Sequence, residues 1–248
     1  MAKFKCVVSY DGTNFAGFQI QPKQRTIQGE IEAALAKINK QAIRIYSSGR
    51  TDTGVHAKGQ TFHFESFLPL ANDEWFRALN TLLPKDIYIK TVQKVAQSFH
   101  ARFDAIEKEY RYFVYTDKVR DLFKRNYAYH FPYELDLAAI LEGCHYLTGE
   151  HDFTTFSSAK ATVKGSRVRT LTKVTCRENE GYYEFIFRGN GFLYHMVRII
   201  VGTLLDIGVG KILPSEIPKL LAAKDRRLVG DTAPPEGLYL WEVTYDLS

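Results

Sequence analysis

Hydrophobic and polar positions along this chain of 248 residues follow two kinds of spacing. Some segments alternate every second residue, which is typical of half-buried strands, and others repeat every three to four residues, which is typical of helices packed on one face. The expected strands cover residues 3–10, 42–48, 60–64, 87–95, 108–116, 169–177, 182–188 and 238–245. The expected helices are those capped by Thr26 and by Asp136, residues 72–83, an apolar segment at 192–209, and one after Pro214.

The order of these elements predicts the fold class. Each half of the chain reads strand–helix–strand–strand–helix–strand, which indicates two related α+β lobes even though no sequence repeat is visible. We expect an N-terminal lobe at residues 1–105 and a C-terminal lobe at 106–248, with their sheets meeting around a central cleft.

The most apolar segment, residues 192–209, is expected to be a buried helix and not a membrane span, because it contains His195, Arg198 and Asp206. The first ten residues are charged and strand-like, unlike a secretory signal. The three cysteines lie far apart and have no metal-type spacing, so they are read as thiols of a reducing compartment. We therefore expect a cytoplasmic protein with no membrane and no metal.

The positive charge is concentrated in the first half of the chain. The formal charge is +5; residues 1–105 carry 14 Lys/Arg against 9 Asp/Glu, and residues 106–248 carry 19 of each. This distribution is compatible with a polyanionic partner, although it does not require one.

The stretch with the densest polar chemistry is Gly49-Arg50-Thr51-Asp52-Thr53-Gly54-Val55-His56-Ala57, between two expected strands. A polar turn would explain the glycines and the Asp and Thr side chains. Asp52-Thr53-Gly54 is also the short motif of aspartic proteases, but those enzymes need two such motifs in an all-β fold. The seven histidines are dispersed, and each alone is more often structural than a ligand.

Arg198 suggests a partner for Asp52. It lies in the apolar segment, where a buried guanidinium needs a carboxylate. The alternative is that Arg198 extends to water from the end of its helix. If it is buried, a loop aspartate such as Asp52 could approach it, and the arginine would hold Asp52 ionised, as a nucleophile requires.

Two further segments could contact nucleic acid. The strand Tyr110-Arg111-Tyr112-Phe113 alternates aromatic and basic residues, which suits base stacking but also any half-buried strand. A basic segment after Ser158 has no acid before Glu178, and it could be a phosphate-contacting arm or a solvated hairpin tip. Its candidate RNA-contacting residues are Lys160, Lys164 and Arg167.

The chain resembles the tRNA pseudouridine synthase A family over essentially its whole length. The family signature Gly-Arg-Thr-Asp-(small)-Gly-Val-His is present at residues 49–56, with Thr53 at the small position. Further matches are Tyr10-Asp11-Gly12-Thr13, Phe99-His100-Ala101-Arg102-Phe103, Lys108-Glu109-Tyr110-Arg111-Tyr112, Phe192 to Arg198, and Ala233-Pro234-Pro235-Glu236-Gly237-Leu238. Tyr194 and His195 replace a pair that is more often polar.

The resemblance implies roles for five residues. Asp52 would be the nucleophile, Tyr110 would stack on the target uracil, and Arg198 would pair with Asp52. Arg50 would help to hold the flipped nucleotide or the RNA that it leaves, and Leu238 would pack against the base. Whether Asp52 attacks the base or the sugar stays open.

The resemblance also implies a fold, a reaction and partners. The fold would be α+β, with two similar lobes and a cleft along a mixed, mainly antiparallel sheet flanked by helices. A homodimer would isomerise uridines 38, 39 and 40 of the tRNA anticodon stem-loop after base flipping, without cofactor or metal. The alternatives are a non-catalytic tRNA-binding or chaperone module, and a hydrolase or lyase that uses Asp52 on a free nucleoside.

Overall fold

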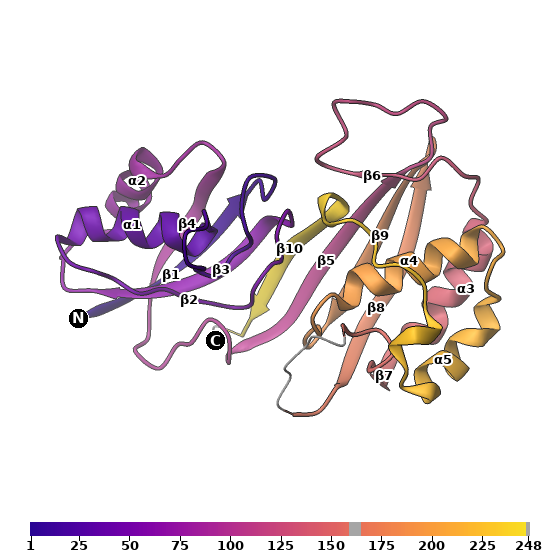
Figure 1. Ribbon diagram of the computed structural model, residues 1–248. Coiled ribbons are helices and arrows are strands. Elements are labelled where there is room, and N and C mark those ends of the chain that lie inside the picture. Colours follow the sequence, from indigo (N-terminus) through magenta and orange to yellow (C-terminus); the bar gives the residue numbers. More distant parts are fainter. Residues whose placement is uncertain (159–164, 247–248) are drawn as a thin grey trace. The chain divides into compact units, whose positions relative to one another are not determined.

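The computed structural model describes residues 1–158 and 165–246 and divides the chain into two compact units (Figure 1). The first unit is Met1–Ile106 together with Tyr239–Ser248, and the second is Glu107–Leu238. The chain thus leaves the first unit after Ile106 and returns to it with its last strand. The division expected from the sequence, 1–105 and 106–248, places that strand in the second half, and it stays a prediction about domains.

The first unit follows the expected strand–helix–strand–strand–helix–strand order. Its sheet has the strand order β4-β1-β3-β10, with β2 also beside β3. β1 pairs antiparallel with β3 and β4, β2 pairs antiparallel with β3, and β10 pairs parallel with β3. The elements are β1 Ala2–Tyr10, α1 Ile27–Asn39, β2 Tyr46–Ser47, β3 His56–Ser66, α2 Asn72–Leu82, β4 Ile87–Val95 and β10 Leu238–Tyr245.

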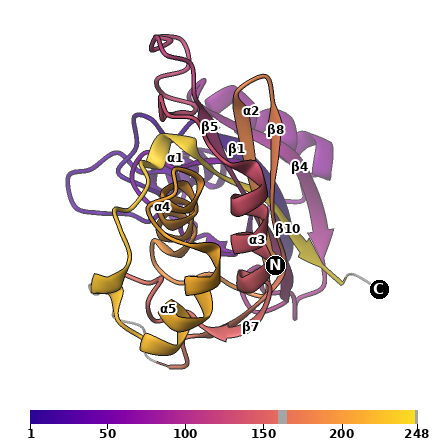
Figure 2. The same ribbon diagram turned by 90° about the vertical axis from the view of Figure 1, so that its right-hand side faces the viewer.

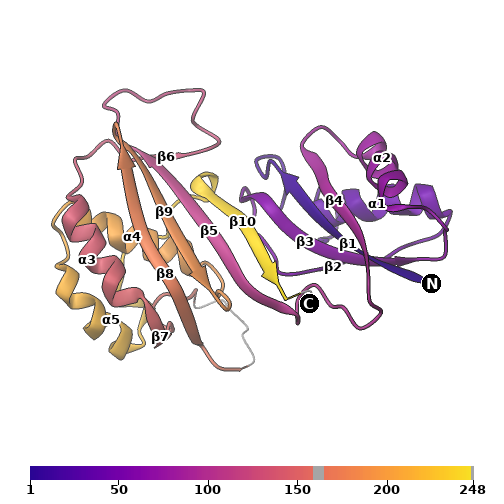
Figure 3. The ribbon, with the colours of Figure 1, turned by 180° about the vertical axis from the view of Figure 1, so that it is seen from behind.

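Alternate residues of β1 form the core of the first unit. Phe4, Cys6, Val8 and Tyr10 are all buried. Helices α1 and α2 cover one face of this sheet (Figures 1 and 3). The Phe64 ring lies 5.4 Å from that of Phe4 and 5.0 Å from that of Trp75 in α2, and such aromatic contacts add to the burial of apolar area.

The second strand is shorter than its sequence pattern suggests. The alternation predicts a strand over residues 42–48, but β2 contains only Tyr46–Ser47. The Ile45 amide donates to Glu32 Oε1 of α1 at 3.0 Å. A helix side chain, and not the carbonyl of a neighbouring strand, therefore accepts this hydrogen bond. β3, conversely, begins earlier than expected, at His56.

The second unit is a four-stranded antiparallel sheet, β5-β9-β8-β7, with the short β6 parallel to β5. Helices α3, α4 and α5 lie on one face of it (Figures 1 and 2). The elements are β5 Ala105–Tyr115, β6 Tyr129–His130, α3 Leu137–Leu147, β7 Gly149–Asp152, β8 Val168–Asn179, β9 Tyr182–Gly189, α4 Met196–Gly208 and α5 Ile217–Ala223, with 3₁₀ turns at Pro214–Glu216, Arg226–Leu228 and Pro235–Gly237.

These sheets and helices confirm the predicted α+β class, mixed and mainly antiparallel in its strand pairing. Both expected helix caps are present, because Thr26 accepts from the Gly29 amide and Asp136 from the Ala139 amide. In the part of the chain that the structure describes, no helix has the length and apolar character needed to cross a membrane. The expected cleft between the lobes stays a prediction.

Candidate active site

The Asp52 loop, residues 48–55, connects β2 to β3 in the first unit. Asp52 is half-buried between the buried Thr51 and the exposed Thr53. The Val55 amide donates to the Asp52 carbonyl at 3.2 Å, which closes a turn. Gly54 has a φ of 77°, a left-handed conformation that glycine adopts without steric cost. The second glycine of the signature therefore shapes the turn that presents Asp52.

A second backbone segment, residues 15–18, lies directly against this loop. The Phe18 amide donates to the Thr51 carbonyl at 3.0 Å, and the Gly54 amide donates to the Phe15 carbonyl at 3.4 Å. Gly17 has a φ of 94°, and a Cβ there would lie 2.8 Å from the Thr51 carbonyl oxygen. Only glycine allows the two backbones to come this close.

The first turn of α1 fixes the same segment from the other side. The Ile27 and Gln28 amides donate to the carbonyls of Gly17 and Phe18, at 3.3 and 2.9 Å. The first amides of a helix have no partner inside the helix, so they are available for such contacts. The backbone of Asp52 is thus linked to the start of α1 through one intervening segment.

Beneath the loop, Tyr10 supports Thr51. The Tyr10 hydroxyl and Thr51 Oγ1 lie 2.8 Å apart, and both side chains are buried. Burial raises the pKa of Tyr10 well above its usual value, so the phenol is protonated at neutral pH. A neutral hydrogen bond therefore holds the residue that precedes Asp52.

At the far end of the loop, His56 binds the Asp11–Gly12 turn. Its ring is buried and stacks on Tyr239 at 4.6 Å between centroids, and Nδ1 accepts from the Gly12 amide at 3.0 Å. Asp11 Oδ1 lies 3.3 Å from the same nitrogen. His56 Nδ1 therefore links the start of β3 to both residues of the Asp11–Gly12 turn.

Tyr10, Gly17 and His56 are residues whose roles are not evident from the sequence pattern alone. Two of them lie in motifs that could have indicated a role: Tyr10 belongs to the Tyr-Asp-Gly-Thr motif, and His56 to the signature itself. What the pattern could not show is that these two segments, more than forty residues apart, contact each other.

Tyr110 and Arg198 lie in the second unit. Tyr110, on β5, is buried, and its ring meets that of Phe192 edge-on at 4.9 Å. Arg198 is half-buried in the first turn of α4; its Nε donates to the Ala233 carbonyl at 2.6 Å, and the Ala233 amide donates back to the Arg198 carbonyl at 3.1 Å. Arg198 therefore fixes the start of the segment that leads to the buried Leu238.

A buried carboxylate beside Tyr110 stabilises β5. Glu109 accepts hydrogen bonds from the guanidinium groups of Arg111, at 2.6 Å, and of Arg188 on β9. Arg111 also donates to Glu184 of β9 at 2.7 Å. A buried acid needs such partners, and these ones tie β5 to β9 at the level of Tyr110.

The remaining predicted residues are distributed over both units. Arg50 is exposed next to the Asp52 loop. Arg167 is half-buried, and its Nη1 donates to Ser157 Oγ at 2.9 Å, so part of its hydrogen-bonding capacity is used within the second unit. Lys160 and Lys164 lie outside the described residues. The pairing of Asp52, in the first unit, with Arg198, in the second, stays a prediction.

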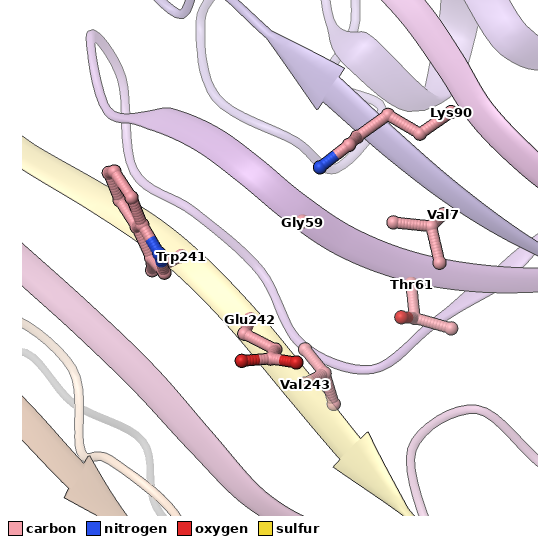
Figure 4. Close-up of a pocket in the computed structure, with 7 residues that line it drawn as sticks. All are labelled: Val7, Gly59, Thr61, Lys90, Trp241, Glu242 and Val243. Atoms are coloured by element: carbon pink, nitrogen blue, oxygen red, sulfur yellow. The ribbon is translucent and has the colours of Figure 1, made fainter.

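A hollow of about 330 Å³ lies elsewhere on the first unit (Figure 4). Its walls come from β1, β3, β4 and β10, and its charged groups are Lys90 and Glu242. It includes none of the predicted site residues. Within residues 1–158 and 165–246, no three His, Cys, Asp or Glu side chains gather in a way that could hold a metal ion.

Comparison with known proteins decides the family. A sequence model described as tRNA pseudouridine synthase matches residues 6–104 and 144–246. This chain belongs to the tRNA pseudouridine synthase family. The Asp52 loop falls in the first matched segment and Arg198 in the second.

Relatives of the same family are similar over nearly the whole chain. The tRNA pseudouridine synthase A of Oceanobacillus iheyensis is 54% identical over 99% of this chain and 98% of its own length. Those of Geobacillus sp. (strain WCH70) and Bacillus subtilis are 54% and 52% identical, each over 98% of this chain and 98% and 99% of their own. A chain in the crystal structure of a Cbf5-Nop10-Gar1 complex aligns at 15% identity with a TM-score of 0.37, over 82% of this chain and 54% of that one, a likeness too weak to argue from.

We predict that Gly17→Ala lowers kcat for pseudouridine formation on the order of 10- to 100-fold, because the new methyl group displaces Thr51 and with it Asp52. Gly210→Ala is the matched control: Gly210 also has a positive φ, 76°, but an added Cβ would meet nothing within 4 Å. It should cost about 1 kcal/mol of stability and leave kcat unchanged. Equal kcat values for the two variants would contradict the prediction.

Proposed function

We propose that this protein converts uridine to pseudouridine at positions 38, 39 and 40 of the tRNA anticodon stem-loop, with Asp52 as the nucleophile. Its family makes it an isomerase that acts on tRNA. The observation that carries the role of Asp52 is its loop, which is held by residues 15–18, by Tyr10 and by His56. A solvated turn does not need support on three sides.

The reaction exchanges one bond for another within a single nucleotide. The bond between N1 of uracil and C1′ of the ribose breaks, a bond between C5 and C1′ forms, C5 loses its hydrogen to solvent, and N1 gains one. A nucleophilic carboxylate can divide this exchange into two easier steps through a covalent intermediate. No atoms are added overall, so the reaction balances without a co-substrate.

The other predicted residues would bind the nucleotide. Tyr110 is a large ring on a strand stabilised by the Glu109 ion pairs, which suits stacking on a flipped base. Leu238 would pack against that base, and Arg50 would contact the RNA. Arg167, Lys160 and Lys164 would contact phosphates.

We expect Asp52→Asn to abolish pseudouridine formation and to leave the Kd for tRNA largely unchanged, because the amide keeps the shape of the side chain but cannot act as an anionic nucleophile. The measurement is release of tritium from tRNA labelled at C5 of uracil, with binding measured in parallel. Asp73→Asn, the same change at an exposed acid of α2, is the control. Turnover by Asp52→Asn would favour the non-catalytic module or another nucleophile, and activity on free uridine would favour the hydrolase or lyase.

Arg198→Leu should lower kcat and move the acidic limb of the pH–rate profile to higher pH. A carboxylate that loses a cationic partner is protonated more easily, so activity at low pH is lost first. Arg198→Lys keeps the charge and should shift the profile less. Thermal unfolding checks that both variants fold; a folded Arg198→Leu with an unchanged pH profile would show that Arg198 does not pair with Asp52.

We also propose that the protein is a cytoplasmic homodimer. Support for the dimer comes from the connection between β5 and β6, which presents Val119, Leu122 and Phe123 with exposed fractions of 81%, 64% and 90%. Local bonds order this connection, since the Phe123 amide donates to Asp121 Oδ1 at 2.8 Å. Ordered, clustered apolar exposure marks contact surfaces. The tRNA substrate and the three free cysteines support the proposed location in the cytoplasm.

Phe123→Asp should therefore shift the protein from dimer to monomer in sedimentation velocity, because a charge would have to be buried in the interface. Phe67→Asp, at a ring that is similarly exposed in the first unit, is the control and should leave the dimer intact. A Phe123→Asp protein that still sediments as the wild type would place the dimer contact elsewhere.

A further inference from the structure

A row of aromatic rings and guanidinium groups, exposed except for the half-buried His100, lies on the first unit away from the Asp52 loop. We call it the aromatic–arginine strip; its members are Arg44, Tyr46, His100, Arg102 and Phe103. Tyr46 and Phe103 expose 46% and 74% of their surface. The members contact one another in sequence: Arg44 lies 5.6 Å from the Tyr46 ring, Tyr46 5.9 Å from His100, His100 4.3 Å from Phe103, and Arg102 5.9 Å from Phe103.

The strip is held in place by the buried His63 of β3. The Tyr46 ring stacks on His63 at 5.2 Å, and the His100 ring meets it edge-on at 4.8 Å. His63 Nδ1 accepts from the Ala101 amide at 3.1 Å. Burial first, and then the nearby His100 and Lys3, lower the pKa of His63 to about 4, so its ring is neutral and able to accept this bond at physiological pH.

Two further hydrogen bonds anchor the backbone of the strip, in the connection between β4 and β5 (Figure 3). The Tyr245 hydroxyl donates to the Ala101 carbonyl at 2.6 Å, and Lys3 Nζ donates to the Phe99 carbonyl at 2.9 Å. The exposed rings therefore sit on a fixed base. Rigid aromatic rings lose little conformational entropy when they bind a partner.

The arginines of the strip are not neutralised. In residues 1–158 and 165–246, neither Arg44 nor Arg102 forms an ion pair with a carboxylate, whereas Arg25 of the same unit pairs with Asp86 and Glu30. Two acids that act electrostatically on His63 have other partners, since Asp104 accepts from the His100 amide and Glu65 pairs with Lys3.

We propose that the aromatic–arginine strip binds an unpaired stretch of the tRNA substrate. Bases would stack on Tyr46 and Phe103, and phosphates would pair with Arg44 and Arg102; single-stranded nucleic acid is bound through this combination. A second copy of the chain fits less well, because it would bring these same cationic groups together. The proposal rests on the proposed function.

The strip is a contact separate from the reacting uridine. His63, on which it rests, follows His56 at the end of the Asp52 loop by seven residues of β3. At about 3.3 Å per residue, this places the strip about 23 Å along the strand from the loop. It therefore contributes to tRNA affinity and leaves the chemical step unaffected.

The test compares tRNA binding by variants of the strip with binding by matched controls. Phe103→Ala should raise the Kd for tRNA roughly 5- to 150-fold, the range for loss of one stacked base. Phe67→Ala, which removes a ring 72% exposed in the same unit, is its control. Arg44→Ala/Arg102→Ala should reduce the slope of log K against log salt by about 1.4 to 1.8, for two lost phosphate contacts. Arg77→Ala, at an exposed arginine of α2, is its control.

All four variants should keep the wild-type kcat at saturating tRNA. Wild-type Kd values and salt slopes in the strip variants, in a preparation that makes pseudouridine, would overturn this proposal and leave the proposed function standing. Wild-type protein that neither binds tRNA nor forms pseudouridine would overturn the proposed function as well. Sedimentation velocity of the same variants tests whether the strip instead binds a second copy of the chain. A strip variant that dissociates to monomers, and binds RNA weakly for that reason, would show that the strip is a contact between copies.

Discussion

The backbone next to Asp52 is held against residues 15–18 by one hydrogen bond, from the Phe18 amide to the Thr51 carbonyl. The contact is possible because Gly17 has no side chain on the side that faces Thr51. The first amides of α1 then fix Gly17 and Phe18. The Asp52 loop is therefore held in part by main-chain groups, which have far fewer conformations than a long side chain.

The supports of the candidate site differ between the two units in their charge. Beneath the Asp52 loop, the buried hydrogen bond between Tyr10 and Thr51 is neutral. Beside Tyr110, the buried Glu109 is balanced by two arginines. A neutral bond avoids placing a second fixed charge next to the proposed nucleophile, Asp52, whereas ion pairs between β5 and β9 fix the register of the strand that carries Tyr110, the ring proposed to stack on the base.

Local sequence signals predicted the parts of the fold that local chemistry determines. Thr26 and Asp136 cap the helices that their patterns indicate, and Gly54 adopts the turn conformation that a signature glycine suggests. The features that the sequence did not predict depend on contacts between residues that are far apart in the chain. Glu32 shortens β2 by bonding Ile45, and the hydrogen bond from Tyr10 to Thr51 joins residues 41 apart in the chain. For the aromatic–arginine strip, residues 99–103 are visible as a motif and residues 44–46 only as part of an expected strand, and the fold brings the two segments together.

The return of the last strand to the first unit has a consequence for how the protein is made. Tyr239 stacks on His56, and Tyr245 bonds Ala101 across 144 positions of sequence. During synthesis, residues 1–106 of the first unit therefore leave the ribosome before β10. The sheet of the first unit stays incomplete until the whole second unit has been made. Contacts so far apart in sequence form slowly. The buried face of His56, next to the Asp52 loop, is thus completed only after the whole second unit has been synthesised, so a chain cut before Tyr239 cannot assemble this part of the candidate site.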